Sequence, residues 1–244
     1  MQVEEQAVFQ ALARLRRQAS MGQVGGFRPP DDPRSSWFGG HGVGLPGERC
    51  PQYDGREMFP LIQINVQELP CVPPQLAETA LLILFLDTEN LPLDQSHGVG
   101  WRIREYSSLE DLVPLPAPTK PSVVRSFPIR WTLVANDVPG WEQFWDLVDF
   151  DPTDEDFHKF PYQYKNHQGT KVGGYPSFLQ GGGHVEGFVF QVDSEYKAHW
   201  EWIDRGIAYF LKPDQQEWRF SCDFLSPYVT LALHSSSVES GRCR

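Results

Sequence analysis

The chain has 244 residues, of which 40% are hydrophobic and 22% charged, so it can bury a large core without disulfide or metal support. Its formal net charge of −11 argues against binding to duplex nucleic acid or to anionic lipid, because both need a basic protein surface. The same charge favours a basic partner, although an acidic surface also serves solubility alone.

The N-terminal residues carry the clearest helical pattern of the chain, which predicts a helix over 3–19. A Gly/Pro-rich segment follows from Gly22 to Pro33 and is too rich in breakers for a helix or a central strand. We therefore treat 1–35 as a helix with a lead-in to the folded domain. The apolar positions of this helix are Val8, Leu12, Leu15 and Ala19.

Eight stretches further along the chain read as strands, and residues 113–121 form a proline-rich connector between them. One more helix is predicted over 141–148, where apolar residues recur at i, i+3, i+4 and i+7. These elements predict an α+β fold of mainly antiparallel sheets with a few peripheral helices, followed by a frayed tail over 235–244. The predicted strands are 59–65, 80–86, 101–106, 123–134, 187–193, 206–211, 218–223 and 228–234.

Neither the cysteines nor the termini point to a metal, a cofactor or a membrane. The longest apolar run, 80–86, is too short to cross a bilayer, and the N-terminus lacks the apolar core of a signal peptide, which predicts a cytoplasmic protein. No two cysteines have C-x-x-C spacing, so we expect reduced thiols and no zinc site. The cysteines are Cys50, Cys71, Cys222 and Cys243.

The chain contains a weak internal repeat. Phe38-Gly39-Gly40 precedes an apolar–Gln–apolar–Asn strand around Gln63 and then an aromatic-bearing strand around Phe85. Val172-Gly173-Gly174 precedes a matching strand around Gln191 and another around Phe210. Three pieces in the same order favour a duplication of one unit. This predicts two similar β-rich halves, about 36–112 and 122–234, within one domain over 36–234.

The same residues carry a family resemblance. Phe38-Gly39-Gly40, Pro60–Ile64, Lys171–Pro176 and Phe190–Asp193 together resemble the signature of the YwqG-like family, over roughly residues 36–225. His41–Gly44 departs from that signature. The resemblance implies a mixed α+β protein of two β-rich halves and no assigned reaction. It also implies toxin immunity by direct binding, since relatives occur near bacterial polymorphic toxins.

The glycine pairs have a structural interpretation. No G-x-x-x-x-G-K-[ST] string occurs, so a phosphate loop is not indicated. Instead we expect Gly39, Gly40, Gly173 and Gly174, with Pro176, to form backbone corners, with Gly173 or Gly174 at positive φ. Scattered histidines and Cys222 show no catalytic spacing, and a serine nucleophile motif is absent. The sequence therefore predicts no catalytic residue and no enzymatic activity.

The most unusual stretch is Asp137–His158, which contains eight acidic residues and no Lys or Arg, a charge of −8 against −11 for the whole chain. Its spacing fits an EF-hand poorly, because Thr153, Asp154 and Phe160 stand at the fifth, sixth and twelfth positions. Two interpretations remain, a solvated acidic face or a docking patch for a basic protein. The predicted patch residues are Asp149, Asp151, Asp154, Glu155, Asp156, Trp141 and Trp145.

Two functions follow from these observations. The first is a non-catalytic immunity protein that neutralises a basic toxin, such as a nuclease, through the acidic patch. The second is a small-molecule- or peptide-binding domain, or an enzyme, that uses a cleft between the two halves. A concave pocket with converging polar groups would favour the second function.

Overall fold

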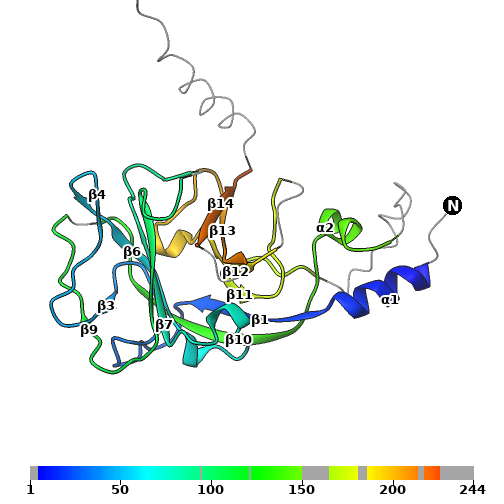
Figure 1. Cartoon of the computed structure of the whole chain (residues 1–244), viewed down its shortest axis with the longest axis horizontal. Coiled ribbons are helices and arrows are strands. Elements are labelled where there is room, and N and C mark those ends of the chain that lie inside the picture. The colour runs from blue at the N-terminus through cyan, green and yellow to red at the C-terminus, as the bar shows by residue number, and fades with distance from the viewer. Residues whose placement is uncertain are drawn as a thin grey trace, which may run out of the picture.

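The computed structural model describes residues 5–93, 95–120, 122–149, 165–180, 186–213 and 217–225. Within these residues the protein is mainly antiparallel β, with two α-helices and three short 3-10 helices (Figure 1). The helices are α1 (Glu5–Leu15), α2 (Trp141–Asp146), η1 (Val66–Glu68), η2 (Pro74–Leu76) and η4 (Tyr196–Ala198). The strands are β1 (Arg17–Val24), β2 (Trp37–Phe38), β3 (Val43–Gly44), β4 (Gln52–Tyr53), β5 (Arg56–Glu57), β6 (Phe59–Asn65), β7 (Leu81–Leu86), β8 (Trp101–Tyr106), β9 (Val113–Pro114), β10 (Phe127–Asp137), β11 (Lys171–Gly173), β12 (Phe188–Asp193), β13 (Ile207–Leu211) and β14 (Arg219–Asp223).

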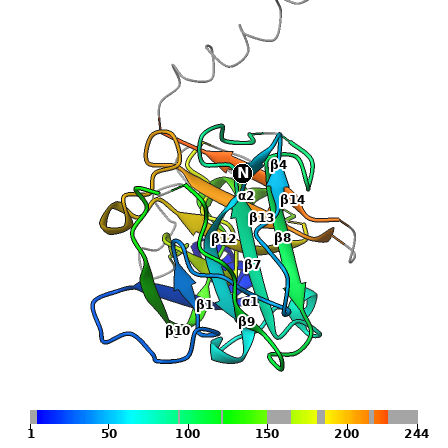
Figure 2. The same ribbon diagram turned by 90° about the vertical axis from the view of Figure 1, so that its left-hand side faces the viewer.

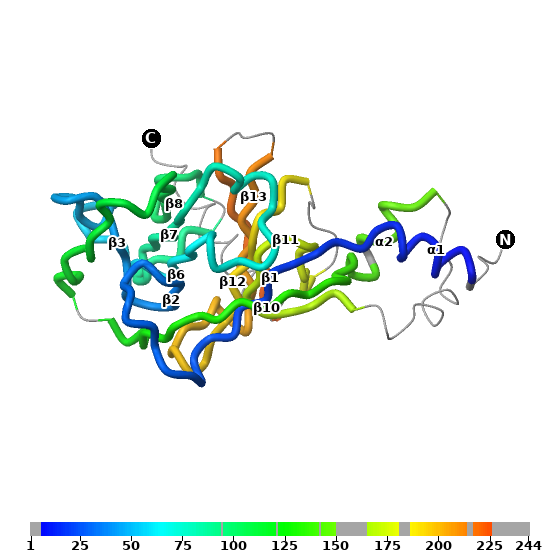
Figure 3. The backbone as a smooth tube through the Cα atoms, turned by 90° about the horizontal axis from the view of Figure 1, so that it is seen from below, coloured from blue at the N-terminus to red at the C-terminus, as the bar shows by residue number. Residues whose placement is uncertain are grey.

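Ten of the strands form one curled sheet in the order β14-β13-β12-β11-β1-β10-β2-β6-β7-β8. We call β2, β6, β7 and β8 the first wing, and β11, β12, β13 and β14 the second wing. The strands β1 and β10 pair with each other between the wings, as the view from below shows (Figure 3). In the side view, β7 and β8 of the first wing stand in front of β12 and β13 of the second, so the wings lie face to face (Figure 2).

The strand β1 corrects two predictions from the sequence. The helix ends at Leu15 rather than at residue 19, and Arg17–Val24 is a central strand of the sheet. Gly22, which we took for a strand breaker, lies in the middle of this strand. A Cβ atom at Gly22 would come within 3.0 Å of the Trp131 ring, so the glycine makes room for that indole on the neighbouring strand. Helical spacing in the sequence therefore continued past the end of the helix.

Most other predicted strands are observed within one residue of their expected bounds. The strand over 123–134 is shifted, since β10 runs from Phe127 to Asp137 with Pro128 inside it. Pro128 is accommodated because it pairs with Trp37 on the short strand β2, while its carbonyl accepts a hydrogen bond from the backbone N–H of Gly25. The predicted helix over 141–148 ends at Asp146. The predicted strand 228–234 lies outside the described residues.

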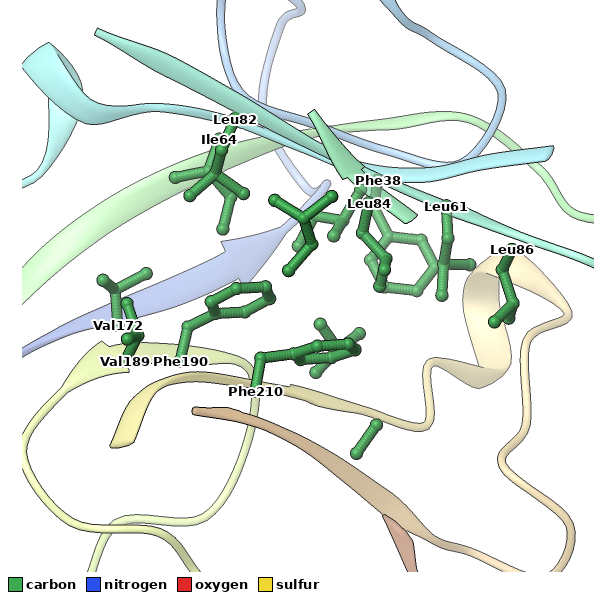
Figure 4. Packing of buried hydrophobic residues seen from close by; sticks show 14 of the residues in the cluster. Phe38, Leu61, Ile64, Leu82, Leu84, Leu86, Val172, Val189, Phe190 and Phe210 are labelled. Atoms are coloured by element: carbon green, nitrogen blue, oxygen red, sulfur yellow. The ribbon is translucent and has the colours of Figure 1, made fainter. Parts of the chain in front are cut away.

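The main core fills the space between the wings. Phe190 and Phe210 stack at 4.5 Å between ring centroids and point from the second wing towards Leu61 and Leu84 of the first (Figure 4). The strands β6, β7, β12 and β13 are buried almost throughout, so they read in the sequence as predominantly apolar runs, interrupted in β6 and β12 by the buried Gln63 and Gln191. Burial of this apolar surface is the principal force that holds the two wings together.

Polar contacts also join the wings at their outer strands. The carboxylate of Glu105 on β8 accepts hydrogen bonds from Lys212 Nζ at 2.9 and 3.0 Å and from Trp218 Nε1 at 3.0 Å. These three side chains bring β8 and the β13–β14 connection together across the open side of the curled sheet.

Among the described helices, none combines the length and the apolarity that crossing a bilayer requires.

Candidate functional site

The acidic segment predicted as a docking patch is only partly described. Asp151, Asp154, Glu155 and Asp156 lie outside the described residues, and Asp149 is exposed beyond the end of α2. Asp146 and Leu147 are exposed beside it, and the Leu147 side chain is 40% accessible. The described end of the patch is therefore a solvent-facing acidic surface with one apolar side chain.

The two tryptophans of that patch pack within the protein. Trp141 and Trp145 meet edge to face at 4.6 Å between ring centroids. Trp145 also packs against a small cluster formed by Val8 and Leu12 of α1 and Phe144 of α2. This packing gives Trp145 a structural role in joining the two helices, so a change in binding on its replacement would have to be separated from a loss of folding.

The glycine pairs form corners at the ends of β2 and β11. Gly39 and Gly40 have φ of 75° and 73°, and Gly173 and Gly174 have φ of 75° and 71°. These left-handed conformations are ones that residues with a Cβ rarely adopt. A Cβ at Gly174 would also collide with Asp137, so that position requires glycine on two grounds. Pro176 follows the second corner, and its carbonyl accepts a hydrogen bond from the Asn166 side chain.

Asp137, at the end of β10, is the centre of a buried polar cluster beneath the second corner. Its fully buried carboxylate accepts four hydrogen bonds, from the backbone N–H and the Nδ1 of His167, from Lys171 Nζ and from the backbone N–H of Tyr175, all between 2.9 and 3.0 Å. Lys171 is also fully buried. Burial lowers the pKa of Lys171, and the carboxylate of Asp137 opposes that effect. The cluster ties the end of β10 to residues 167–175, a segment distant from it in the sequence.

The chemistry available to this cluster is limited by what surrounds His167. The carboxylate of Asp137 orients the imidazole through Nδ1, which is the arrangement of a general base. Within the described residues, however, no hydroxyl or thiol forms a hydrogen bond with this ring, since the hydroxyl of Ser177 donates to the backbone carbonyl of His167 instead. The described residues also contain no group of three or more His, Cys, Asp or Glu side chains placed to hold a metal ion. What the hydrogen bonds of Asp137 do directly is hold the end of β10 against residues 167–175.

A concave site lies elsewhere, between the wings. A groove of about 880 Å³ is lined by residues from segments 49–59, 87–91, 118–120, 122–124 and 199–203. We call it the inter-wing groove, because the first two segments belong to the first wing and the last belongs to the second. Its volume is within the range of about 300–1,000 Å³ that is typical of small-molecule sites. Phe59 and Trp200 line it as largely buried aromatic side chains, 7% and 5% exposed.

Charged side chains of both signs converge on this groove. The Arg56 guanidinium forms an ion pair with Asp87 at 2.7 Å, and Lys120 pairs with Glu89 at 2.8 Å. Burial alone would raise the pKa of Asp87, but the hydrogen bonds from Arg56 and from two backbone N–H groups outweigh burial and lower it. Glu57 accepts hydrogen bonds from the backbone N–H and hydroxyl of Thr119, which lower its pKa. The Lys120–Glu89 pair and the Thr119–Glu57 hydrogen bonds hold the connector 118–120 against the first wing.

The opposite wall of the groove has a strained backbone. His199 and Ile203 line the groove with φ of 54° and 55°, and Arg205 follows with φ of 50°. A β-branched residue such as Ile203 is a genuine outlier in this region. The loop is held by Ser194, whose hydroxyl accepts from the backbone N–H of Trp202 at 3.0 Å and donates to the carbonyl of Gly206 at 2.8 Å. Backbone strain of this kind persists where the surroundings over-determine it, and it clusters at functional sites.

Reasoning from the sequence missed the lining residues of the groove. Arg49, Arg56 and Glu201 belong to no recognisable motif, and they are brought together only by the meeting of two wings that are far apart in the sequence. The one signal present was the predicted duplication, which suggested a cleft between two halves without saying which residues would line it.

The comparison with protein families covers the ten-stranded sheet except for β1 and the last residues of β14. A family model described as a domain of unknown function (DUF1963) matches residues 36–221. No curated protein is similar enough in sequence to add a second comparison. Since the match covers most of the chain, the protein belongs to the DUF1963 family.

Proposed function

We propose that this member of the DUF1963 family is a non-catalytic binding protein whose ligand, a small molecule or a short peptide, lies in the inter-wing groove. The observation that carries the proposal is the groove itself, a concave site of about 880 Å³ with an aromatic base and converging charges. A pocket of this kind is what distinguishes a ligand-binding domain from a protein that uses only a flat acidic face.

We further infer that the two wings are copies of one unit. Each has four antiparallel strands in sequence order, and Trp37 pairs with Gln63 as Lys171 pairs with Gln191. When the two wings are aligned on Gly39 and Gly173, the four strands of one wing correspond to the four strands of the other.

The hydrogen bonds of the two glutamines support this alignment. Gln63 Oε1 accepts from the backbone N–H of Val43, four residues after Gly39, and Gln191 Oε1 accepts from that of Ser177, four residues after Gly173. The Nε2 groups donate to the carbonyls of Ser35 and Gly169, each four residues before its glycine. Identical contacts at identical offsets favour duplication, and a site between duplicated units is a common place for a ligand.

A screen with a groove-filling variant tests the proposal. Val123 lines the groove and its side chain is 78% exposed, so Val123→Trp should occupy the groove without disturbing the core. Thermal-shift measurements and two-dimensional NMR with a library of small molecules and short peptides should find ligands that bind the wild type and not this variant. Val72→Trp is the matched control, because Val72 is 41% exposed and lines a different surface pocket. Ligands that bind Val123→Trp as well as the wild type would contradict the proposal.

A second proposal concerns the acidic segment. The resemblance to YwqG-like proteins and the acidic residues between Glu142 and Asp156 support a role in binding a basic protein, such as a cognate toxin. Asp137 belongs to the predicted acidic stretch but not to this surface, because its carboxylate is buried and paired with Lys171. The exposed Asp146 and Asp149 extend this charge onto the described surface. Reversal of Asp151, Asp154, Glu155 and Asp156 to Lys should slow association with the product of an adjacent toxin gene steeply at low salt. Unchanged affinity and salt dependence would exclude this patch as the interface.

A further inference from the structure

The charged side chains of the inter-wing groove divide into those already ion-paired or hydrogen-bonded within the protein and those whose polar atoms are left for a ligand. The Arg56–Asp87 and Lys120–Glu89 pairs are complete, and Glu57 is engaged by Thr119. The remaining charged side chains of the groove within the described residues are those of Arg49 on the first wing and Glu201 on the second, with the imidazole of His199 beside Glu201.

Arg49 and Glu201 are both open to a bound molecule. Both residues are exposed. The guanidinium of Arg49 makes no hydrogen bond or ion pair with the described residues, and only its longer-range attraction acts on Glu57. Glu201 uses one carboxylate oxygen, Oε1, to accept from the backbone N–H of Arg205 at 3.1 Å, with the Tyr196 hydroxyl at 3.5 Å. Its other oxygen, Oε2, forms no hydrogen bond within the described part of the chain.

On the basis of the proposed function, we propose that the ligand of the inter-wing groove is a short zwitterionic peptide, with its carboxylate at Arg49 and its ammonium group at Glu201. An arginine and a carboxylate on opposite walls complement a molecule that carries one charge of each sign at its two ends. A ligand with only negative charge would face Glu201, and a ligand with only positive charge would face Arg49.

The apolar part of the groove indicates the middle of this peptide. Phe59 and Trp200 form the aromatic base, and Val123 presents an exposed side chain on the rim. An apolar side chain between the two charged ends would cover Val123 and contact the aromatic base, so its burial adds to the affinity. The preferred peptide therefore has charged termini and an apolar central residue.

Blocked peptides test this proposal directly. Titration calorimetry would use an unblocked tripeptide with a central leucine and three blocked forms of it: N-acetylated, C-amidated, and blocked at both ends. Each block removes one charge, and loss of one charged contact corresponds to roughly tenfold or greater weakening. We expect each single block to weaken binding to the wild type by that factor, and the double block to abolish measurable binding.

Two variants assign the ends of the peptide. Arg49→Gln should remove the effect of C-amidation and leave that of N-acetylation, whereas Glu201→Gln should do the reverse. Glutamine at 201 keeps an oxygen that can accept from the Arg205 backbone, so the loop is preserved. Arg102→Gln and Glu110→Gln, exposed charges outside the groove, are matched controls that should behave as the wild type.

The outcomes separate this inference from the proposed function. Equal binding of blocked and unblocked peptides, or equal loss of both preferences in Arg49→Gln, would overturn the zwitterion assignment. If tripeptides fail to bind, but other small molecules bind the wild type and not Val123→Trp, the groove remains a ligand site and the peptide inference falls. If neither class binds in the groove, both proposals fall.

Discussion

The buried Asp137–Lys171 ion pair gives the sharpest prediction about stability. Both side chains are fully buried, and their charged atoms are 3.0 Å apart. Asp137→Asn would leave the Lys171 ammonium facing a neutral amide. One half of that amide is an NH₂ group, which cannot accept from the donors that now surround the carboxylate. Breaking a buried pair from one side typically costs about 3–5 kcal/mol, so we expect a loss of that size.

The reverse change should cost less. In Lys171→Met the carboxylate of Asp137 keeps three donors, the backbone and Nδ1 of His167 and the backbone of Tyr175. Only one charge-assisted hydrogen bond is lost, which corresponds to about 1.5–3 kcal/mol. The double variant Asp137→Asn, Lys171→Met no longer buries an unpaired ammonium, so it should be more stable than the sum of the single effects by about 1–3 kcal/mol.

Urea denaturation of the wild type and the three variants measures this cycle at neutral pH. Circular dichroism and tryptophan fluorescence should follow the same transition, and the denaturant dependence should be unchanged among the variants. A coupling below about 0.5 kcal/mol, or a larger loss for Lys171→Met than for Asp137→Asn, would refute the argument that an unpaired buried charge dominates the cost.

Four other positions give predictions of direction and rough size. Burial raises the pKa of Asp193 to about 6, so the folded state binds its proton more tightly than the unfolded chain, and this residue's contribution to stability falls as pH rises through about 6. Asp193→Asn, which copies Asn65 at the matching position of the first wing, should raise the free energy of unfolding at pH 7 and flatten that dependence in urea titrations over about pH 4–7, the range in which this contribution is lost. Gln63→Leu and Gln191→Leu should each lose roughly 1–3 kcal/mol in the same assay, because each leaves buried backbone groups without partners, and near-neutral values would contradict the role of these contacts. Gly174→Ala should lower the stability of the fold more than Gly47→Ala does. Both glycines have positive φ, but only a Cβ at position 174 would collide with Asp137. Equal changes in melting temperature for the two variants would show that the structure relieves this collision.

The sequence was a good guide to the strands because their burial is nearly complete. Phe59–Asn65 and Leu81–Leu86 are buried at every position, so a largely apolar run marks the first and a continuous apolar run marks the second. The failure at Arg17–Val24 has a different cause. Its strand character comes from pairing on both sides with β10 and β11, and the contact between Gly22 and Trp131 is invisible to local propensity. Tertiary context overrode a helical pattern that continued by chance.

The candidate site was less predictable for a physical reason. A catalytic motif concentrates its chemistry in a short segment, whereas the inter-wing groove draws single residues from loops separated by up to about 150 positions, such as Arg49 and Glu201. Loops carry no periodicity, so nothing in the local sequence distinguishes Arg49 from any other surface arginine. The predicted duplication was the one long-range signal in the sequence, and the Gln63 and Gln191 contacts that correspond to it position the frameworks of the two wings, not the loops between them.

That separation of framework from loops suggests how the function varies within this architecture. In both wings the buried glutamine fixes the segment after the glycine corner, Val43 in one and Ser177 in the other, while the loops that follow are free to differ. The connection between β6 and β7 carries η1 and η2, but its counterpart between β12 and β13 carries η4 and the strained residues that line the groove. The β12–β13 connection therefore holds left-handed residues that the β6–β7 connection lacks. Ser194 holds this strain in place, and replacing Ile203 by Gly, which adopts positive φ freely, should relieve the strain and stabilise the fold while loosening the loop geometry that a ligand would meet. Higher stability together with weaker peptide binding in Ile203→Gly would connect that strain to function, whereas unchanged peptide binding would leave it as a feature of the framework alone.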